Sequence, residues 1–254
     1  MLNQINIQDI VSIAKDAGNA IMQIYAQDFE VEYKQDSSPL TLADKKANDI
    51  IENGLMNKLS VKFPILSEEG ENIPYEERRD WEYFWLVDPL DGTKEFVNKN
   101  DEFTVNIALI HKDMPVFGVV YAPALDICYW AKQNDGAFKD GQKLPLKTKS
   151  QQQSCKIIAS RSHMSGETQA FIDNIETNKE KELISIGSSL KICLVAEGEV
   201  DIYPRLSPTM EWDTGAAHAI VIESGKSLQK YKDGKYSKHK YNKKCLLNSF
   251  FVVK

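Results

Sequence analysis

The sequence has few of the residues that build zinc sites, disulfide frameworks or histidine-based catalytic centres. Its four cysteines lie far apart in the chain, at Cys128, Cys155, Cys193 and Cys245. Because no Cys-x-x-Cys pair occurs, the pattern argues against zinc and against disulfides, and it favours a reducing compartment. Three of the four histidines have no partner at ligand spacing and are interpreted as structural: His111, His218 and His239.

Long apolar runs and an excess of basic residues are also missing. No apolar run approaches the roughly 20 residues of a transmembrane helix, and Met1 to Asp9 lacks the pattern of a signal peptide. The chain has 31 Lys and Arg against 37 Asp and Glu, a net charge of −6, which disfavours a nucleic-acid-binding surface. We therefore expect a cytoplasmic protein without an integral membrane segment. Peripheral contact with the inner face of the membrane and the oligomeric state are left open.

The 254 residues, 42% of them hydrophobic and 27% charged, are typical of a soluble globular protein with one large or two small domains. Helical periodicity is present over 5–26, and a second helix is expected from Thr41 to about Leu59. The spacing of β-rich runs predicts an antiparallel meander. These runs are Phe103–Ile110, Val116–Tyr121 and Ile127–Ala131.

The polar segment Lys147–Ser154 is the expected domain boundary, and strands alternate with helices beyond it. Strands are expected at 157–160, 183–186, 200–203 and 246–253, and helices at 166–178, 190–197 and 212–223. Alternation of this kind predicts α/β layering. The sequence thus predicts an α/β protein with an α+β domain over 1–150 and an α/β domain over 151–254.

An acidic turn follows the apolar run Tyr83–Val87, which is expected to form a buried strand. Pro89 is expected to end this strand, because it has no backbone N–H to donate to a sheet. Asp88 and Asp91 then lie three residues apart around the turn. Their carboxylates at the end of a rigid strand are ligands that hard cations such as Mg²⁺ prefer.

The same turn continues into Gly92 and Thr93. Glycine permits a left-handed backbone, and Thr93 is predicted to be the N-cap of a short helix from Lys94, with amides available to phosphate. Asp, Pro and Gly are also common in ordinary surface turns. The apolar strand that precedes this turn favours a functional site over a plain connection.

Further acidic residues open onto turns beside apolar segments, and each has a structural alternative. Glu68 and Glu69 follow the short apolar segment Pro64–Leu66 and could form a solvated loop. Asp44 has the spacing of a helix capping box, and Asp213 lies in a first helical turn, where the macrodipole favours an acid. Strand ends at one edge of a sheet would bring such acids together.

These motifs resemble a known family. The segment Asp88-Pro89-x-Asp91-Gly92-Thr93, with Glu68-Glu69 upstream and Trp212-Asp213 downstream, is similar to the inositol monophosphatase superfamily of Mg²⁺-dependent, Li⁺-sensitive phosphatases. Four further segments narrow the resemblance to CysQ-type 3′(2′),5′-bisphosphate nucleotidases: Asp91–Phe96, Phe103–Ile107, Gly187–Lys191 and Tyr203–Thr214. Inositol phosphatases usually have Asn where this chain has Glu95.

The resemblance implies a layered α/β/α/β/α fold and a catalytic site with two Mg²⁺ ions, a third, weaker one being left open. One ion would be held by Glu68, Asp88 and the Leu90 carbonyl, and the other by Asp88, Asp91 and Asp213. It also implies that Thr93 and Asp44 orient or deprotonate the attacking water, with Glu68 as a further catalytic residue.

For the substrate, the resemblance implies contacts from the metal-site residues and from the Gly92 and Thr93 amides. The second phosphate would be bound by Lys191 and Arg205, with Ser188 and His163 nearby. Structural alternatives are a solvent-facing Lys191 and a surface salt bridge of Arg205. The implied reaction is hydrolysis of adenosine 3′,5′-bisphosphate to AMP and phosphate, within sulfur metabolism. Alternatives are an inositol monophosphatase and a non-catalytic nucleotide- or metal-binding sensor.

Overall fold

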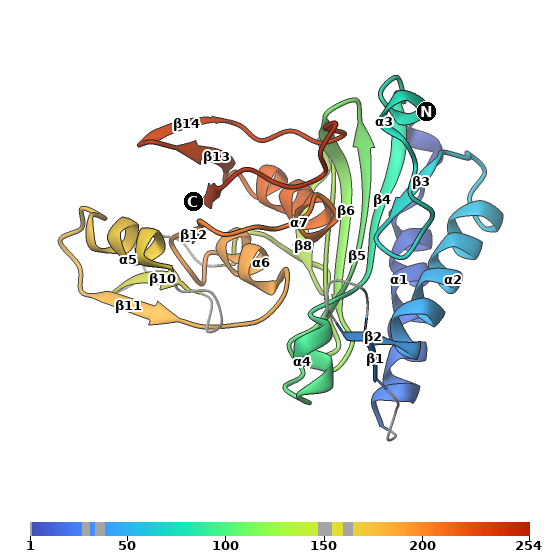
Figure 1. Ribbon diagram of the computed structural model, residues 1–254, viewed down its shortest axis with the longest axis horizontal. Coiled ribbons are helices and arrows are strands. Elements are labelled where there is room, and N and C mark those ends of the chain that lie inside the picture. Colours follow the sequence, from blue (N-terminus) through green and yellow to red (C-terminus); the bar gives the residue numbers. More distant parts are fainter. Residues whose placement is uncertain (1, 27–30, 34–38, 147–153, 160–164) are drawn as a thin grey trace.

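The computed structural model describes residues 2–26, 31–33, 39–146, 154–159 and 165–254. Its elements form successive layers, with helices α1 and α2 on one side, a large sheet, helices α6 and α7, a second sheet, and α5 on the far side (Figure 1). The predicted α/β/α/β/α layering is therefore confirmed. Among the described residues, no helix is long and apolar enough to cross a membrane.

Helices α1 (Ile7–Tyr25) and α2 (Leu42–Asn57) cover one face of the large sheet (Figure 1). The Asn6 side chain caps α1 by accepting a hydrogen bond from the Gln8 amide. The two helices touch where a Cβ on Gly54 would lie 2.7 Å from the Ile13 side chain, so only glycine permits this approach. A short 3₁₀ helix (Leu2–Gln4) precedes α1, and the antiparallel strands β1 (Val31–Tyr33) and β2 (Pro39–Thr41) precede α2.

The large sheet has seven strands in the order β3-β4-β5-β6-β7-β8-β9. Its strands are β3 (Ile65–Ser67), β4 (Tyr83–Asp91), β5 (Thr104–His111), β6 (Met114–Ala122), β7 (Ile127–Lys132), β8 (Gly136–Lys139) and β9 (Gln142–Lys143). Strands β3 and β4 are parallel and are connected through α3 (Tyr75–Arg78), whereas every later pair is antiparallel. The predicted antiparallel meander is therefore confirmed.

Strand β4 is buried on both faces. Trp85 and Val87 pack in the cluster beneath α1 and α2, whereas Phe84 and Leu86 pack in the cluster on the opposite face. The expectation that Pro89 ends this strand was wrong. Asp88 pairs with Asn106 and Asp91 with Thr104, so a bulge lies between them. A bulge tolerates proline because the extra residues make no regular ladder hydrogen bonds.

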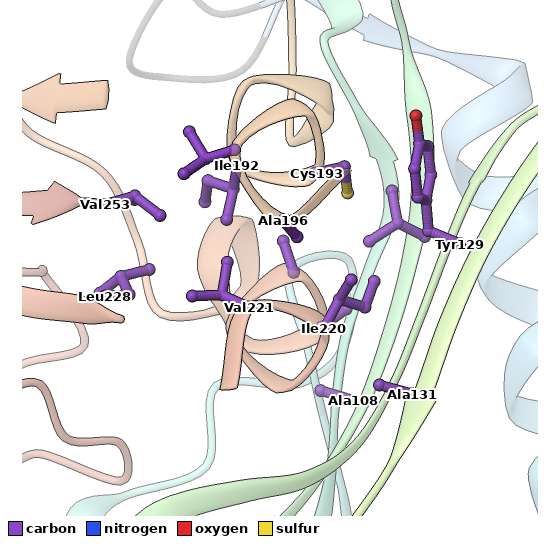
Figure 2. Close-up of a cluster of buried hydrophobic side chains, with 14 of the residues drawn as sticks. Ala108, Tyr129, Ala131, Ile192, Cys193, Ala196, Ile220, Val221, Leu228 and Val253 are labelled. Carbon is purple, nitrogen blue, oxygen red and sulfur yellow. The ribbon is translucent and has the colours of Figure 1, made fainter. Parts of the chain in front are cut away.

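Helices α6 (Leu190–Glu197) and α7 (Trp212–Glu223) lie between the two sheets. Figure 2 shows Cys193 and Ile220 facing the large sheet, while Val221 faces Leu228 and Val253 of the second sheet. The second sheet has the order β12-β15-β13-β14. Its strands are β12 (Tyr203–Arg205), β15 (Phe251–Val253), β13 (Leu228–Lys232) and β14 (Lys235–Lys238).

The outer layer holds β10 (Cys155–Ile158), which is parallel to β11 (Lys181–Ile184), and helix α5 (Gly166–Asp173). Compared with the sequence expectations, α5 is shorter, the strand expected at 200–203 lies at β12, and the C-terminal strand begins only at Phe251. The expected boundary segment lies mostly outside the described residues. Because one core cluster joins strands of the first half to α6 and α7, the two-domain division remains a proposal.

Candidate active site

Two of the predicted acids are brought together by the parallel pairing of β3 and β4. Ser67 pairs with Val87, so Glu68 and Asp88 follow at the same edge of the sheet. The Glu68 amide donates to the Val87 carbonyl over 3.1 Å, which ties the two strand ends together. Asp88 is only 1% exposed, and its Oδ1 accepts a hydrogen bond from the Leu90 amide at 3.1 Å.

Asp213 joins them from the first turn of α7, where its Oδ2 accepts a hydrogen bond from the Met210 amide at 2.8 Å. Carboxylate oxygens of Glu68, Asp88 and Asp213 lie within 4.8 Å of one another. Burial, followed by the neighbouring acids, raises the pKa of Asp88 and of Asp213 well above its ordinary value. Crowded buried carboxylates with oxygen ligands fit a hard divalent cation, which would offset their repulsion.

The remaining predicted acids lie close enough to act on Asp88. Asp44 is 2% exposed in the first turn of α2, and its charge and that of Asp91 both raise the pKa of Asp88. Five predicted acids from four parts of the chain therefore converge on one place. This convergence favours a functional site over the separate structural alternatives.

The turn after Asp91 has a different local structure from the one expected. Gly92, not Thr93, is the N-cap of α4 (Thr93–Val97), and its φ of +94° is a conformation that L side chains rarely adopt. Thr93 is the first helical residue, and its hydroxyl donates a long hydrogen bond of 3.4 Å to the Leu90 carbonyl. The Leu90 carbonyl and the Thr93 hydroxyl thus lie side by side next to the acid cluster.

Asp91 is held by Ser189, a residue that sequence reasoning missed. The Ser189 amide and hydroxyl lie 2.6 and 2.8 Å from Asp91 Oδ2. Ser189 follows Ser188, which has a left-handed φ of +46° that no sequence pattern indicates. The only available signal was its place inside the Gly187–Lys191 segment.

A cavity of about 150 Å³ adjoins this cluster. It is lined by Asp91, Gly92, Lys94, Glu95, Ser188, Ser189, Lys191, Ile192, Tyr203, Arg205, Thr209, Asp213, Thr214 and Phe251. The predicted cations Lys191 and Arg205 therefore open onto the same space as the acids Asp91 and Asp213. His163, the remaining predicted substrate contact, lies outside the described residues.

Lys191 and Arg205, two of the three described cations that line this cavity, are partly withdrawn from water. Burial lowers the pKa of Lys191, a shift that Asp91 opposes, and the Lys191 ammonium lies 3.4 Å from the Ile186 carbonyl. Arg205 donates from Nη2 to the Pro208 carbonyl at 3.0 Å, and its buried Nε has no hydrogen-bond partner among the described residues. Desolvated cations with unused donors fit an anionic ligand.

A family model described as the inositol monophosphatase family matches residues 4–251. The chain belongs to the inositol monophosphatase family. Phosphatases of this family are generally dependent on Mg²⁺, which agrees with the acid cluster found here.

Similar family members are CysQ proteins. The 3′(2′),5′-bisphosphate nucleotidase CysQ of Salmonella typhimurium is 44% identical to this chain, and the match covers 86% of this chain and 88% of the Salmonella protein. The protein with the same name from Buchnera aphidicola is 43% identical, and the match covers 97% of this chain and 92% of the Buchnera protein. The crystal structure of CysQ from Bacteroides thetaiotaomicron, a bacterial member of the family, matches with a TM-score of 0.87 at 42% identity, over 99% of this chain and 97% of that one.

Proposed function

We propose that the chain is a Mg²⁺-dependent 3′(2′),5′-bisphosphate nucleotidase that hydrolyses adenosine 3′,5′-bisphosphate to AMP and phosphate. It is a phosphoric monoester hydrolase with a role in sulfur metabolism. The observation that carries this proposal is the shared cavity, which is lined by the cations Lys191 and Arg205 together with the acids Asp91 and Asp213. A substrate with two phosphates needs one anion site beside the metal site, whereas a monophosphate needs none.

The proposed metal ligands are Glu68, Asp88 and the Leu90 carbonyl for one cation, and Asp88, Asp91 and Asp213 for the other. Bound there, the cations would supply Lewis-acid activation of water and neutralise charge on the phosphoryl group. A third, weaker cation near Asp44 and Thr93 belongs to the same proposal. The crowding of Asp88 by four other carboxylates supports this assignment, because a bound cation would offset the repulsion among them.

The side chains and amides of the protein orient the attacking water and bind the two phosphates of the substrate. The Thr93 hydroxyl and the Asp44 carboxylate orient the attacking water, and the Asp44 carboxylate receives its proton. Glu68 acts as one of the proposed metal ligands. The amides of Gly92 and Thr93 bind oxygens of the reacting phosphate. Ser188, Lys191 and Arg205 bind the other phosphate and so align the substrate, and positioning of this kind supplies a large part of phosphatase catalysis.

Two other functions would give different assay results. An inositol monophosphatase would release phosphate from inositol phosphate, and a sensor would bind nucleotide and metal without turnover. The deciding experiment is phosphate release with Mg²⁺ from a panel of adenosine 3′,5′-bisphosphate, inositol phosphate and fructose bisphosphate. We also propose a cytoplasmic location, where the free cysteines of the chain stay reduced.

Replacement of Lys191 or Arg205 by alanine should selectively impair the bisphosphate substrate. Charge-assisted contacts to phosphate are strong, and binding energy from this remote group also aligns the reacting phosphate. We expect kcat/KM for the bisphosphate to fall by about 10- to 100-fold, because such a contact contributes roughly 1.5–3 kcal/mol. A 3′-monophosphate nucleotide lacks this phosphate, so its slow hydrolysis should change little.

The measurement is the ratio of the two kcat/KM values in wild type and in each variant. Lys58→Ala is the matched control, since this lysine is paired with Asp16 at 2.7 Å outside the cavity. A ratio that stays at the wild-type value in Lys191→Ala and Arg205→Ala would show that these residues do not bind the second phosphate. That result would favour the inositol monophosphatase alternative.

Turnover should require Mg²⁺, pass through an optimum as Mg²⁺ rises, and be inhibited by Li⁺. An all-oxygen ligand set suits hard cations and not zinc, and Li⁺ sensitivity is what the family resemblance implies. The measurement is initial rate against metal concentration after treatment with a chelator. Full activity in chelator, or indifference to millimolar Li⁺, would count against the proposed metal site.

A further inference from the structure

Ser189 lies beside the acid cluster, where β4, β5 and α7 meet. It is buried, at 3% exposure, and it is the residue that precedes the first turn of α6. Its amide and hydroxyl both contact Asp91 Oδ2, at 2.6 and 2.8 Å, and its hydroxyl oxygen also lies 2.8 Å from the Asp213 carbonyl. Asn106 donates to the same hydroxyl at 2.9 Å. One serine thus connects β4, β5 and α7.

The chemistry of the hydroxyl determines how these contacts are used. A serine hydroxyl has one proton, so it donates either to Asp91 or to the Asp213 carbonyl at a given moment. Donation to the carboxylate is favoured, because hydrogen bonds to a charged acceptor are the stronger ones. Asn106 occupies a lone pair of the hydroxyl oxygen, which directs its proton away from Asn106 and toward these acceptors.

Among the described residues, the Asp91 carboxylate accepts hydrogen bonds from the Asn106 side chain, the Ser189 amide and the Ser189 hydroxyl. All three donate to Oδ2. The orientation of that carboxylate is therefore fixed from one side, and Oδ1 is the oxygen left for another ligand. We propose that Ser189 is a positioning residue of the metal site, which fixes Asp91 so that Oδ1 is presented to a divalent cation. This inference rests on the proposed metal-dependent phosphatase.

The position of Ser189 also links the metal site to the substrate side of the cavity. The Gly187 amide is held by the Glu102 carboxylate at 2.8 Å, and a Cβ on Gly187 would lie 2.7 Å from the Glu102 carbonyl. This anchored segment carries Ser188 and leads to Lys191. Partners that orient a metal ligand typically change metal affinity by about 10- to 100-fold when they are removed.

The test is calorimetric titration of the full chain with Mn²⁺ and with Mg²⁺, without substrate. Ser189→Ala should bind the more weakly held metal about tenfold less tightly, while the Ser189 amide preserves part of the orientation. Ser189→Cys should behave like Ser189→Ala, because the thiol fills the volume of the hydroxyl but is a weak donor. In turnover assays the Mg²⁺ concentration for half-maximal rate should rise by a similar factor, with little change in KM for the nucleotide at saturating Mg²⁺.

Ser224→Ala is the matched control. This serine is also buried, at 8% exposure, but its hydroxyl donates only to the Val221 carbonyl at the far end of α7, so metal binding should be unchanged. Wild-type affinity in Ser189→Ala, or in Ser189→Cys alone, would overturn the hydrogen-bonding role. If the wild-type chain bound neither metal, the metal-dependent function itself would be overturned, and the two failures are thus distinguishable.

Discussion

Replacement of Asp88 by asparagine is expected to abolish turnover and, at the same time, to stabilise the metal-free protein. Asp88 is the proposed bridge between both cations, and it is the centre of the acid cluster. The change keeps the size of the side chain and an oxygen that still accepts the Leu90 hydrogen bond. It removes only the charge, so the fold should remain intact.

The expected loss of activity is large because both cations lose a charged ligand. Several kcal/mol of transition-state stabilisation correspond to about 10³-fold or more in kcat/KM. The measurement is turnover of the bisphosphate nucleotide at saturating Mg²⁺, which separates catalysis from weakened metal binding. Activity within a few-fold of wild type would contradict the bridging role.

The gain in stability follows from the direction of the pKa shift. The folded-state pKa of Asp88 is raised, so the folded protein holds this proton more tightly than the unfolded chain does. The metal-free fold therefore loses stability as pH rises from about 4, the usual value of an aspartate, toward the raised pKa. The Asp88→Asn change would remove this loss, so the Tm of the variant in chelator at neutral pH should exceed that of the wild type.

Glu197 provides the matched control for this stability measurement. It is also buried, but it accepts hydrogen bonds from Tyr129 at 2.7 Å and from Lys139 at 2.9 Å. Glu197→Gln should lower the Tm, because a paired buried charge leaves its partner uncompensated when it is neutralised. A lower Tm in Asp88→Asn as well would show that the charge of Asp88 stabilises the metal-free fold. It would contradict the idea that this charge needs a bound cation to offset it.

The sequence sufficed to predict how the acids converge, because simple geometry governs their placement. Glu68 and Asp88 each follow an apolar strand, and the carboxyl ends of neighbouring parallel strands meet at one edge of a sheet. Asp213 was assigned to the cluster by the family resemblance, and the structure has it in the first turn of α7. Local patterns of hydrophobicity thus accounted for Glu68 and Asp88, and the resemblance supplied the other acids.

The details around Asp91 depend on long-range contacts that local patterns do not encode. Pro89 was expected to end β4, but pairing with β5 resumes beyond the bulge, because β5 supplies partners on both sides of it. Ser189 reaches Asp91 from 98 positions further along the chain, after the left-handed residue Ser188. Such a contact depends on the packing of α6 and α7 between the sheets.

The last prediction concerns the two residues proposed to act on water. Thr93→Ala and Asp44→Asn should each lower kcat by about 10²-fold or more, the usual contribution of proton transfer to a positioned group, with smaller changes in KM. Asp44 is nearly inaccessible to solvent and its charge acts on Asp88, so the Mg²⁺ dependence of each variant has to be measured as well. Thr168→Ala, a buried threonine of α5, is the control for the loss of a hydroxyl.

The combination of the two changes decides whether these residues work together. Residues that act as one unit fail together, so the double variant should lose little more kcat than the more damaged single variant. Independent residues would instead give a loss equal to the product of the single losses. We expect the shared role, because Thr93 contacts the Leu90 carbonyl and Asp44 acts on Asp88, two residues before Leu90. A multiplicative loss at saturating Mg²⁺ would therefore separate Thr93 and Asp44 into different steps of the reaction.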